Sequence, residues 1–379
     1  MTDMNSYLQH HIVDRVDILY TRGRYPRLHG MNAIKGYHGF GGDVYLARIW
    51  TNQGAQGWGV LSESVEVAEK TKELLIGKPL NVLIDCDEGI LSESLRAFDI
   101  PLHDLAARIV GIPVSKMINP NAVASCGIYD GAIYMNDLIP EDKPWGVERV
   151  MKDCEDDLML GHRALKIKVG RGHMWMEPHA GMERDIEIVN RIHERWPEVT
   201  LMVDANDGYS VDDAITFLKG TKNVPIYWFE EPMREAETSF RPLKRFIRAN
   251  CPGTRIADGE NRTDIPLLFD LAGKGLLDVL QPDVCGYGFT PWRKLLKEMV
   301  KHGFAGSPHA WGHVVKTNCC AHLAVAYPQH IPYIEAVLGT TEGIDAAGYV
   351  LKDGMLHVPQ TPGFGMELEF ALEVGKTFP

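Results

Sequence analysis

The sequence predicts an α/β fold, a (β/α)8 barrel with an N-terminal α+β capping domain that the C-terminal tail completes. The chain has 379 residues, more than a single average domain needs. From about residue 124 onward, short apolar segments that end in polar residues alternate with longer segments of helical spacing. Successive segment ends from Lys168 to Glu335 lie between 23 and 36 residues apart, as expected for one strand, one helix and two short loops. No glycine-rich dinucleotide fingerprint follows any of these strands, so an open doubly wound sheet is disfavoured.

Eight strands are expected in the barrel, and each is expected to end at the same mouth. They are Ser125–Asp130, Leu165–Lys168, Leu201–Asp204, Ile226–Glu230, Arg255–Glu260, Val279–Asp283, Ala305–His309 and Tyr333–Glu335. We expect the barrel to occupy residues 123–344, the capping domain residues 1–122, and the tail 345–379 to pack back on that domain.

The capping domain begins with strand-like and helix-like segments. Strand character is found in Val13–Thr21 and Val44–Thr51, and helical spacing in Ser64–Ile76 and Leu95–Val110. Pro101 is expected to open the second helix, because proline is favoured in a first turn. Between the two strands, the basic and glycine-rich segment from Arg22 to Gly42 is expected to be a long mobile loop that closes over the substrate.

Charge and composition exclude several classes of partner. Lys and Arg total 39 against 51 Asp and Glu, a net charge of −12, which argues against nucleic acid or an anionic membrane as the main partner. No apolar run reaches the length of a membrane span. Seven cysteines without a CxxC pair, together with a start that lacks a basic and apolar leader, predict reduced thiols and a cytoplasmic protein.

The polar residues that end the predicted strands are those from which catalytic sites are built. In chain order they are Lys166, Lys168, Asp204, Glu230, Glu260, Asp283, His309 and Glu335. Three successive strands each supply one carboxylate, Asp204, Glu230 and Glu260. Carboxylates that converge in a cleft repel one another and need a cation, and ligands that are all oxygen favour Mg²⁺.

The remaining strand-end residues suggest acid and base groups. Lys166 and Lys168 are two positions apart on a strand, so both face the same side, and two adjacent cations lower each other's pKa. Asp283 and His309 end neighbouring strands, so the carboxylate can orient the imidazole. His313 lies four residues after His309 and leaves a zinc site as an alternative, which lacks a third His or Cys nearby.

These residues lie in motifs that resemble the mandelate racemase subgroup of the enolase superfamily over nearly the whole chain. The matching motifs are Lys166-Ile-Lys168, Val203-Asp204-Ala205-Asn206, Trp228-Phe229-Glu230-Glu231-Pro232, Asp258-Gly259-Glu260-Asn261, Leu280-Gln281-Pro282-Asp283, Ser307-Pro308-His309 and Ile334-Glu335-Ala336. The N-terminal loop and the 170–181 insert are the departures from the family's pattern. The family is one of the known patterns of pKa tuning, with a Lys or His base and Mg²⁺.

The resemblance implies the removal of a proton α to a carboxylate. One Mg²⁺ per subunit is expected on Asp204, Glu230 and Glu260, with Lys166 beside it and Glu231 as a supporting partner. Lys168 and the His309–Asp283 pair are expected on opposite faces of the α-carbon. A protonated Glu335 would donate a hydrogen bond to a substrate oxygen, and Asn206 would contact a hydroxyl.

Two reactions share such a site, a dehydration and a racemisation. The basic N-terminal loop favours dehydration of a polyhydroxy sugar acid to a 2-keto-3-deoxy acid, because its donors suit hydroxyls or a second carboxylate. The expected donors are Arg24, Arg27, Tyr37 and His38. A racemase or epimerase of a 2-hydroxy acid is the main alternative; a zinc-dependent barrel hydrolase and a sugar-acid binder without activity are the others. We expect a small-molecule carboxylate as the substrate and a homo-oligomer.

Overall fold

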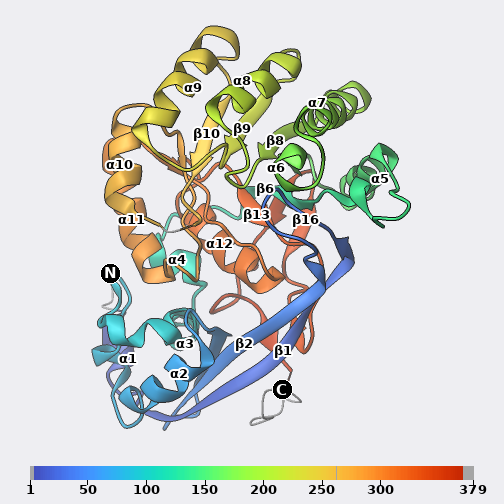
Figure 1. Cartoon of the computed structure of the whole chain (residues 1–379). Helices are drawn as coiled ribbons and strands as arrows, with labels where there is room; N and C mark the ends of the chain where they lie inside the picture. The colour runs from blue at the N-terminus through green and yellow to red at the C-terminus, as the bar shows by residue number, and fades with distance from the viewer. Residues whose placement is uncertain (1–3, 262, 370–379) are drawn as a thin grey trace.

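Two long antiparallel strands, β1 (Val13–His29) and β2 (Gly39–Thr51), run along the N-terminal part of the chain (Figure 1). The structure is a computed structural model that describes residues 4–261 and 263–369. Residues 1–3, which belong to the predicted leaderless start, and residues 370–379 of the predicted tail lie outside the described residues. The rest of this part comprises α1 (Asn5–Leu8), β3 (Gln56–Val60), α2 (Val65–Thr71), β4 (Ile84–Asp85), β5 (Gly89–Ile90), α3 (Asp99–Val110) and α4 (Val114–Ile118), with 3-10 turns between them.

The predicted basic loop is mostly strand. β1 continues to His29 and β2 begins at Gly39, with Arg24 still paired to Gly41 across the two strands. Only residues 30–38 lack regular structure. The second predicted helix, α3, begins at Asp99, so that Pro101 lies within its first turn instead of opening it. Gly57 of β3 is required here, because a Cβ at this position would lie 2.4 Å from the Leu105 backbone of α3.

Eight parallel strands with helices on their outer side form the larger part (Figure 1). In chain order the elements are β6 (Ser125–Ile133), α5 (Val147–Met159), β7 (Ala164–Lys168), α6 (Arg171–Met174), α7 (Pro178–Arg195), β8 (Thr200–Asp204), α8 (Val211–Gly220), β9 (Ile226–Glu230), α9 (Glu237–Asn250), β10 (Arg255–Asp258), α10 (Ile265–Gly273), β11 (Val279–Leu280), α11 (Phe289–His302), β12 (Ala305–Gly306), α12 (Val314–Ala326) and β13 (Ile334–Ala336). Each strand lies within or overlaps a segment that the sequence predicts.

The strands pair in chain order from β6 to β12, and β13 returns to pair with β6. Among the described residues, β12 and β13 form no strand pair, so the sheet topology does not show the predicted barrel closed. The strand β12 has only two residues, and the amide of Gly306 donates to the carbonyl of His330, which precedes β13, instead of to β13.

The side chains inside this sheet form an apolar cluster, and charged side chains follow toward the carboxyl ends of the strands. Alternate residues of a strand face opposite sides, so Leu165 and Ile167 of β7 pack outward against the helices, whereas Lys166 and Lys168 face inward. Tyr129, Met202 and Trp228 belong to the small apolar cluster of the interior. The strand-end charges therefore lie at the carboxyl ends of the strands, next to this buried apolar cluster.

The C-terminal residues contact both parts of the structure. Their strands are β14 (Thr340–Thr341), β15 (Ile344–Asp345), β16 (Val350–Lys352), β17 (Met355–His357) and β18 (Glu367–Leu368). β14 pairs with β1, and β17 pairs antiparallel with β6. The amide of Phe364 donates to Asp104 of α3 at 2.8 Å.

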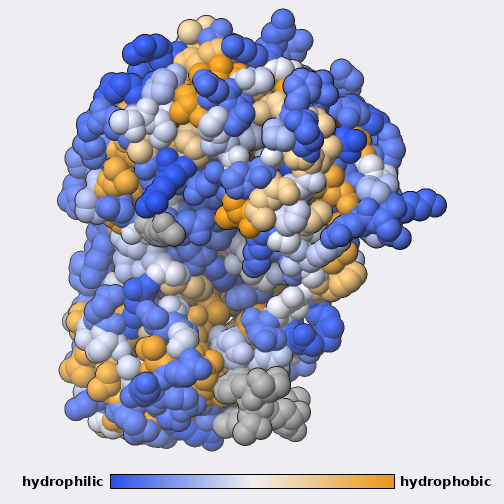
Figure 2. Space-filling model, in the orientation of Figure 1, coloured by the Kyte–Doolittle hydropathy of each residue, from blue (hydrophilic) through white to orange (hydrophobic). Residues whose placement is uncertain are grey.

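The visible face of the molecule lacks one dominant apolar patch among the described residues (Figure 2). In residues 4–261 and 263–369, every helix is too short or too polar to cross a bilayer. The face shown in Figure 2 is largely hydrophilic, with apolar residues in small scattered groups. All seven cysteines are free thiols.

Candidate active site

The register of the strands brings the predicted site residues to one edge of the sheet. Lys168 is the register partner of Asp204, and Asp204 is the partner of Glu230. Asp283 and His309, which follow β11 and β12, form an isolated parallel bridge. Because parallel strands end at the same edge, their terminal side chains share one mouth.

Lys166 lies at the centre of a buried cluster of carboxylates. Its Nζ is 3.1 Å from Glu335 Oε1 and 3.3 Å from Asp204 Oδ2, and it forms a third ion pair with Glu230. Burial acts to lower the pKa of Lys166, but the charges of Glu230 and Glu335 outweigh it and hold that pKa well above its ordinary value. The expectation that Lys168 lowers the pKa of Lys166 is therefore wrong for this lysine, because anions surround it.

Lys168 and Asp204 form the second ion pair of the site. The Nζ of Lys168 lies 2.5 Å from Asp204 Oδ2. Burial opposes ionisation of Asp204, yet the charges of Lys168 and Lys166 and the amide of Asn206 hold its pKa well below the ordinary value. Asp204 is thus an anion at neutral pH.

His309 lies between two carboxylates. Its Nδ1 is 2.8 Å from Asp283 Oδ2, and its Nε2 is 2.9 Å from Glu260 Oε2. Burial acts to lower the pKa of His309, but Glu260, Glu335 and Asp283 raise it well above the ordinary value. The ring is therefore a cation among these carboxylates.

Asp283, the partner of His309, also bonds a lysine that was not predicted from the sequence. The Nζ of Lys316, on α12, lies 2.5 Å from Asp283 Oδ2 and 2.9 Å from the carbonyl oxygen of Trp311. Although burial acts to raise the pKa of Asp283, the charge of Lys316 and the hydrogen bond from His309 hold it well below the ordinary value. No sequence signal identifies Lys316, because its position depends on how α12 packs over the strand ends.

Glu335 is ionised, which corrects the expectation that it carries a proton. Burial acts to raise its pKa, but Lys166 and His309 outweigh burial and lower the pKa to about 2. The amide of Ala310 also donates to Glu335 Oε2 at 3.0 Å. A carboxylate in this state accepts hydrogen bonds and cannot donate one.

Glu231 and Asn206 lie behind the predicted metal ligands. The amide Nδ2 of Asn206 donates to Glu231 Oε2 at 3.2 Å, and that of Asn261 donates to Glu231 Oε1 at 2.9 Å. Burial and the charges of Glu260 and Asp204 raise the pKa of Glu231 well above its ordinary value. Negative charge is therefore in excess around Glu231.

The three predicted metal ligands fit a hard cation in type and position, but not in their present side-chain conformations. Burial, together with Asp204, Glu335 and Glu260, raises the pKa of Glu230 to about 7 although Lys166 opposes the shift, as expected for carboxylates that lack enough cations. Within residues 4–261 and 263–369, no three His, Cys, Asp or Glu side chains already converge as a metal site requires. The reason is local, because one oxygen of Asp204 bonds Lys168 and one of Glu260 bonds His309.

A cavity of about 260 Å³ opens onto these residues. Lys168, Asn206, Glu260, His309 and Glu335 line it from the strand ends. His313 does not line it, and lies instead at the start of α12. The zinc alternative, which needs both histidines on one ion, gains no support from this arrangement.

The comparisons with known proteins agree with this geometry. A family model described as enolase C-terminal domain-like matches residues 149–372. The chain belongs to the enolase superfamily. The structure of galacturonate dehydratase from Geobacillus sp., complexed with D-galacturonate and 5-keto-4-deoxy-D-galacturonate, is 32% identical and matches over 95% of each chain with a TM-score of 0.88.

Two further relatives lie in the same superfamily and extend the comparison. A mandelate racemase/muconate lactonizing protein from Geobacillus sp. Y412MC10, complexed with magnesium and tartrate, is 32% identical, with 96% of this chain and 94% of that one covered and a TM-score of 0.89. The D-galactarolactone cycloisomerase of Agrobacterium fabrum is 26% identical over 299 residues, which is 74% of this chain and 72% of that protein. The resemblance to the mandelate racemase subgroup is confirmed.

The N-terminal residues expected to bind the substrate of this superfamily member divide into two groups. His38 lines the cavity, whereas Arg24, Arg27 and Tyr37 do not. Arg24 forms an ion pair with Glu342, and its side chain is 60% exposed. Arg27 forms a buried ion pair with Asp157 of α5, and Tyr37 is half exposed. Arg24 and Arg27 are three positions apart in β1 and are engaged by Glu342 and Asp157, so the structure does not bring the two expected arginines to the cavity.

Several lining residues were not predicted. They are Asn32, Ile34, Lys35, Tyr134, Asn261 and Trp311. Asn261 directly follows Glu260, and Tyr134 lies just beyond the first barrel strand, so their nearness to strand ends was an available signal. Asn32, Ile34 and Lys35 belong to the Arg22–Gly42 segment that was expected to close over the substrate, but the sequence gave no reason to single out these three residues.

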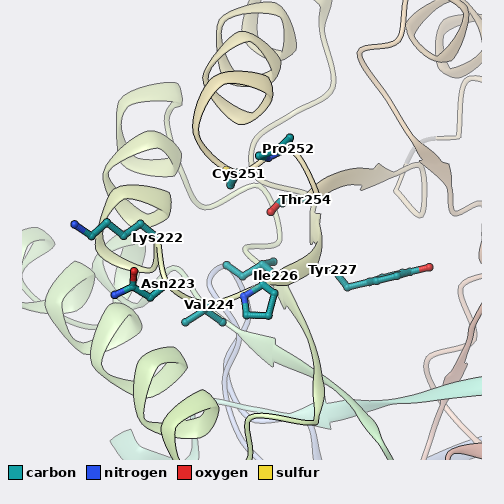
Figure 3. Close-up of a pocket in the computed structure, with 10 residues that line it drawn as sticks. Lys222, Asn223, Val224, Ile226, Tyr227, Cys251, Pro252 and Thr254 are labelled. Carbon is teal, nitrogen blue, oxygen red and sulfur yellow. The ribbon is translucent and has the colours of Figure 1, made fainter.

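A second hollow lies at the opposite ends of β9 and β10 (Figure 3). It has a volume of about 380 Å³ and is lined by residues 222–227 and 251–254. Among these described residues, Lys222 alone is charged at neutral pH, and no acid and base converge there. Its larger volume does not make it a candidate active site, because enzymes with this architecture act at the carboxyl ends of the strands.

Proposed function

We propose that this protein is an acid-sugar dehydratase. It removes the proton α to the carboxylate of a polyhydroxy sugar acid, and β-elimination of water then gives a 2-keto-3-deoxy acid. The single observation that carries the proposal is that Lys168 and His309 line one cavity from different strands, with Glu260 and Glu335 beside them. An elimination needs a base at the α-carbon and an acid at the leaving hydroxyl, and this arrangement supplies two such groups.

The acid and the base have separate roles in the proposal. Glu260, Glu335 and Asp283 hold His309 as a cation, so it is suited to protonate the departing hydroxyl. Lys168 is the base for the α-proton, and it can accept that proton only as a neutral amine, after it has left its ion pair with Asp204 and given its own extra proton to solvent. Asp283 orients His309, and Lys316 holds Asp283.

Asp204, Glu230 and Glu260 would hold one Mg²⁺ per subunit, as Mg²⁺ is present in solved relatives. When bound, the ion supplies positive charge against the two oxygens of the enediolate. Lys166 adds a fixed cation at the same place. Glu335 is ionised and can only accept hydrogen bonds. It can therefore bond to a substrate carboxyl group only if that group carries a proton. Asn206 is placed to contact a hydroxyl, since it lines the cavity.

The relatives support the reaction class but leave two outcomes. They are named as dehydratases, cycloisomerases and epimerases. An epimerase would use the same two bases and return the proton to the opposite face of the α-carbon. The proposal also includes a closed barrel at residues 123–344, a cap at residues 1–122 with the tail 345–379, a homo-oligomer and a cytoplasmic location.

Turnover of a library of sugar acids with Mg²⁺, with 2-keto acid as the readout, tests the dehydratase. Formation of an epimer without any 2-keto acid would show that the epimerase alternative holds. His313→Asn is the matched control, because His313 lies outside the cavity. Loss of activity in a folded His313→Asn variant, with zinc retained by the wild type, would favour the hydrolase.

Isotope exchange tests the two roles. His309→Asn is expected to stop dehydration while Lys168 still exchanges the α-proton with deuterated solvent. Lys168→Ala is expected to leave any exchange to His309, on the α-epimer of opposite configuration. If both variants exchange the same epimer equally, the assignment of the two groups to opposite faces is wrong.

A further inference from the structure

Residues 30–38, between β1 and β2, form one wall of the cavity. Asn32, Ile34, Lys35 and His38 line it, opposite the strand ends. We call these nine residues the wall segment. It is the part of the capping region that meets the candidate active site, so it is where the far end of a substrate would lie.

The wall segment is anchored and does not behave as a free lid. Asn136 accepts from the amide of Gly30 at 2.9 Å and donates to the carbonyl of Leu28 at 3.1 Å. Trp175, from the 170–181 insert, donates from Nε1 to the carbonyl of Asn32 at 2.6 Å. Met31 and Ala33 are buried in a small apolar cluster with Met135 and Ile139. The backbone path of the wall segment is therefore set before a substrate binds.

The hydrogen bond of His38 determines which nitrogen carries its proton. Nδ1 lies 2.8 Å from the carbonyl oxygen of Gly30, and a carbonyl can only accept, so Nδ1 is the donor. Burial, with Lys168 and Lys35 nearby, lowers the pKa of His38 to about 4, so the ring is neutral at pH 7. In a neutral ring with its hydrogen on Nδ1, Nε2 is a hydrogen-bond acceptor.

Two aromatic residues fix the plane of this ring. The ring of His38 lies 4.6 Å from that of Tyr134 and 5.8 Å from that of Trp311, in an edge arrangement with the latter. Both residues line the cavity with His38. The acceptor is therefore held in one orientation within an aromatic corner, an environment suited to a sugar chain with C–H and O–H groups.

The wall segment offers little to a second carboxylate. An acceptor nitrogen repels a carboxylate oxygen, because neither atom has a hydrogen to share. Lys35 is exposed, and an exposed ion pair contributes little binding energy. Arg24 and Arg27 are occupied by Glu342 and Asp157.

We propose that His38 is a specificity-determining residue that accepts a hydrogen bond from a substrate hydroxyl through Nε2, and that the wall segment selects sugar acids whose far end is uncharged. This inference rests on the proposed dehydration of a sugar acid. It favours aldonates and uronates, whose far ends are uncharged, as substrates over aldarates, which carry a second carboxylate.

A pair of substitutions isolates the acceptor. His38→Gln places an amide oxygen near the position of Nε2, whereas His38→Asn reaches only the position of Nδ1 and keeps the bond to Gly30. We expect His38→Asn to lower kcat/KM by about ten- to hundredfold, as for one lost hydrogen bond in a substrate site, and His38→Gln to retain most of it. Tyr37→Phe is the control for local disturbance, because Tyr37 is exposed and outside the cavity.

Deoxy substrates identify the hydroxyl. The best substrate is compared with analogues that lack one non-reacting hydroxyl each. For one analogue, the kcat/KM of the wild type is expected to fall to the value that His38→Asn shows with the full substrate. The kcat/KM of His38→Asn is expected to be the same with that analogue as with the full substrate. If His38→Asn and His38→Gln have equal kcat/KM with every substrate, His38 does not act as the acceptor.

Substrates that differ only at the far end test the selection. For the galacto configuration these are L-galactonate, D-galacturonate and galactarate, which end in a hydroxymethyl group, an aldehyde and a carboxylate. We expect galactarate to have a kcat/KM at least about tenfold lower than the better of the other two. A preference for galactarate would overturn the inference. A wild type that dehydrates no sugar acid would overturn the proposed function as well, whereas dehydration with the wrong far-end preference overturns this inference alone.

Discussion

Arg24 and Arg27 belong to one basic stretch of sequence, and the structure predicts opposite consequences for replacing them with methionine. The side chain of Arg27 is 10% exposed, and it bonds Asp157 of α5, whose side chain is fully buried. Its Nε also lies 3.5 Å from Asp153. The side chain of Arg24 is 60% exposed and pairs with a half-exposed Glu342. Arg27→Met therefore strands the buried Asp157, while Asp153 keeps its ion pair with Arg149 at 2.9 Å. Arg24→Met instead releases an anion into water.

The expected magnitudes follow from this difference in burial. Removal of one partner from a buried pair costs about 3–5 kcal/mol of stability, because the other charge stays buried without compensation. An exposed pair contributes about 0–1 kcal/mol. Asp130 adds no new compensation when Arg27 is lost, since burial and the charge of Asp157 already raise its pKa well above the ordinary value, and its hydrogen bond with Asp157 is present in the wild type as well. We expect the full loss for Arg27→Met and almost none for Arg24→Met.

Urea unfolding followed by tryptophan fluorescence measures both losses, and kcat/KM per folded protein is measured beside it. Arg27→Met combined with Asp157→Asn should be more stable than Arg27→Met alone, because the stranded charge is removed. Neither single variant should lower kcat/KM more than a few fold, because neither arginine lines the cavity. The reasoning is refuted if Arg24→Met lowers kcat/KM at least about tenfold without loss of stability, as a direct contact with substrate would.

Three further predictions concern the metal ligands and the wall segment. Glu260→Gln is expected to abolish both metal retention and turnover, as measured by metal analysis and 2-keto acid formation; full activity of the wild type in chelator would contradict this. The pKa of Glu230 is about 7, and its proton must leave when an ion binds, so apparent Mg²⁺ affinity should weaken about tenfold per pH unit below pH 7. Calorimetry in two buffers measures that proton release, and an affinity that is flat between pH 5.5 and 7 contradicts it. Trp175→Phe removes the donor to Asn32 and should raise KM by about fivefold with kcat unchanged; an equal fall in kcat would show a role in the chemical step.

The strand-end residues were predictable because two simple periodicities fix them. A buried strand alternates its side chains, so Lys166 and Lys168 had to share a face, and parallel strands end at one edge. The register then placed Lys168 beside Asp204 and Asp204 beside Glu230 without further information. The pairing of His309 with Asp283 follows from the same rule, since the two residues end neighbouring strands.

The contacts that sequence could not predict depend on packing between elements. The basic stretch around Arg24 has enough glycine to suggest a loop, yet the hydrogen bonds of β2 hold it in a strand to His29. Lys316 reaches Asp283 only because α12 packs across the strand ends. The ionised state of Glu335 depends on how closely Lys166 approaches it, which spacing along the chain does not encode.

The balance of charge in the site explains how so many acids are buried together. Four carboxylates with lowered pKa face four cationic groups; the acids are Asp204, Glu260, Asp283 and Glu335, and the cations are Lys166, Lys168, Lys316 and His309. Lys166 is shared among Glu230, Asp204 and Glu335, so the fifth acid, Glu230, has no cation of its own, and burial with the neighbouring carboxylates raises its pKa to about 7. A divalent cation would add two positive charges to a cluster that is already near balance. One would be met by the ionised Glu230 and the other by the carboxylate of a substrate. The same accounting predicts that substrate and Mg²⁺ bind with positive cooperativity, because each compensates a charge that the other leaves.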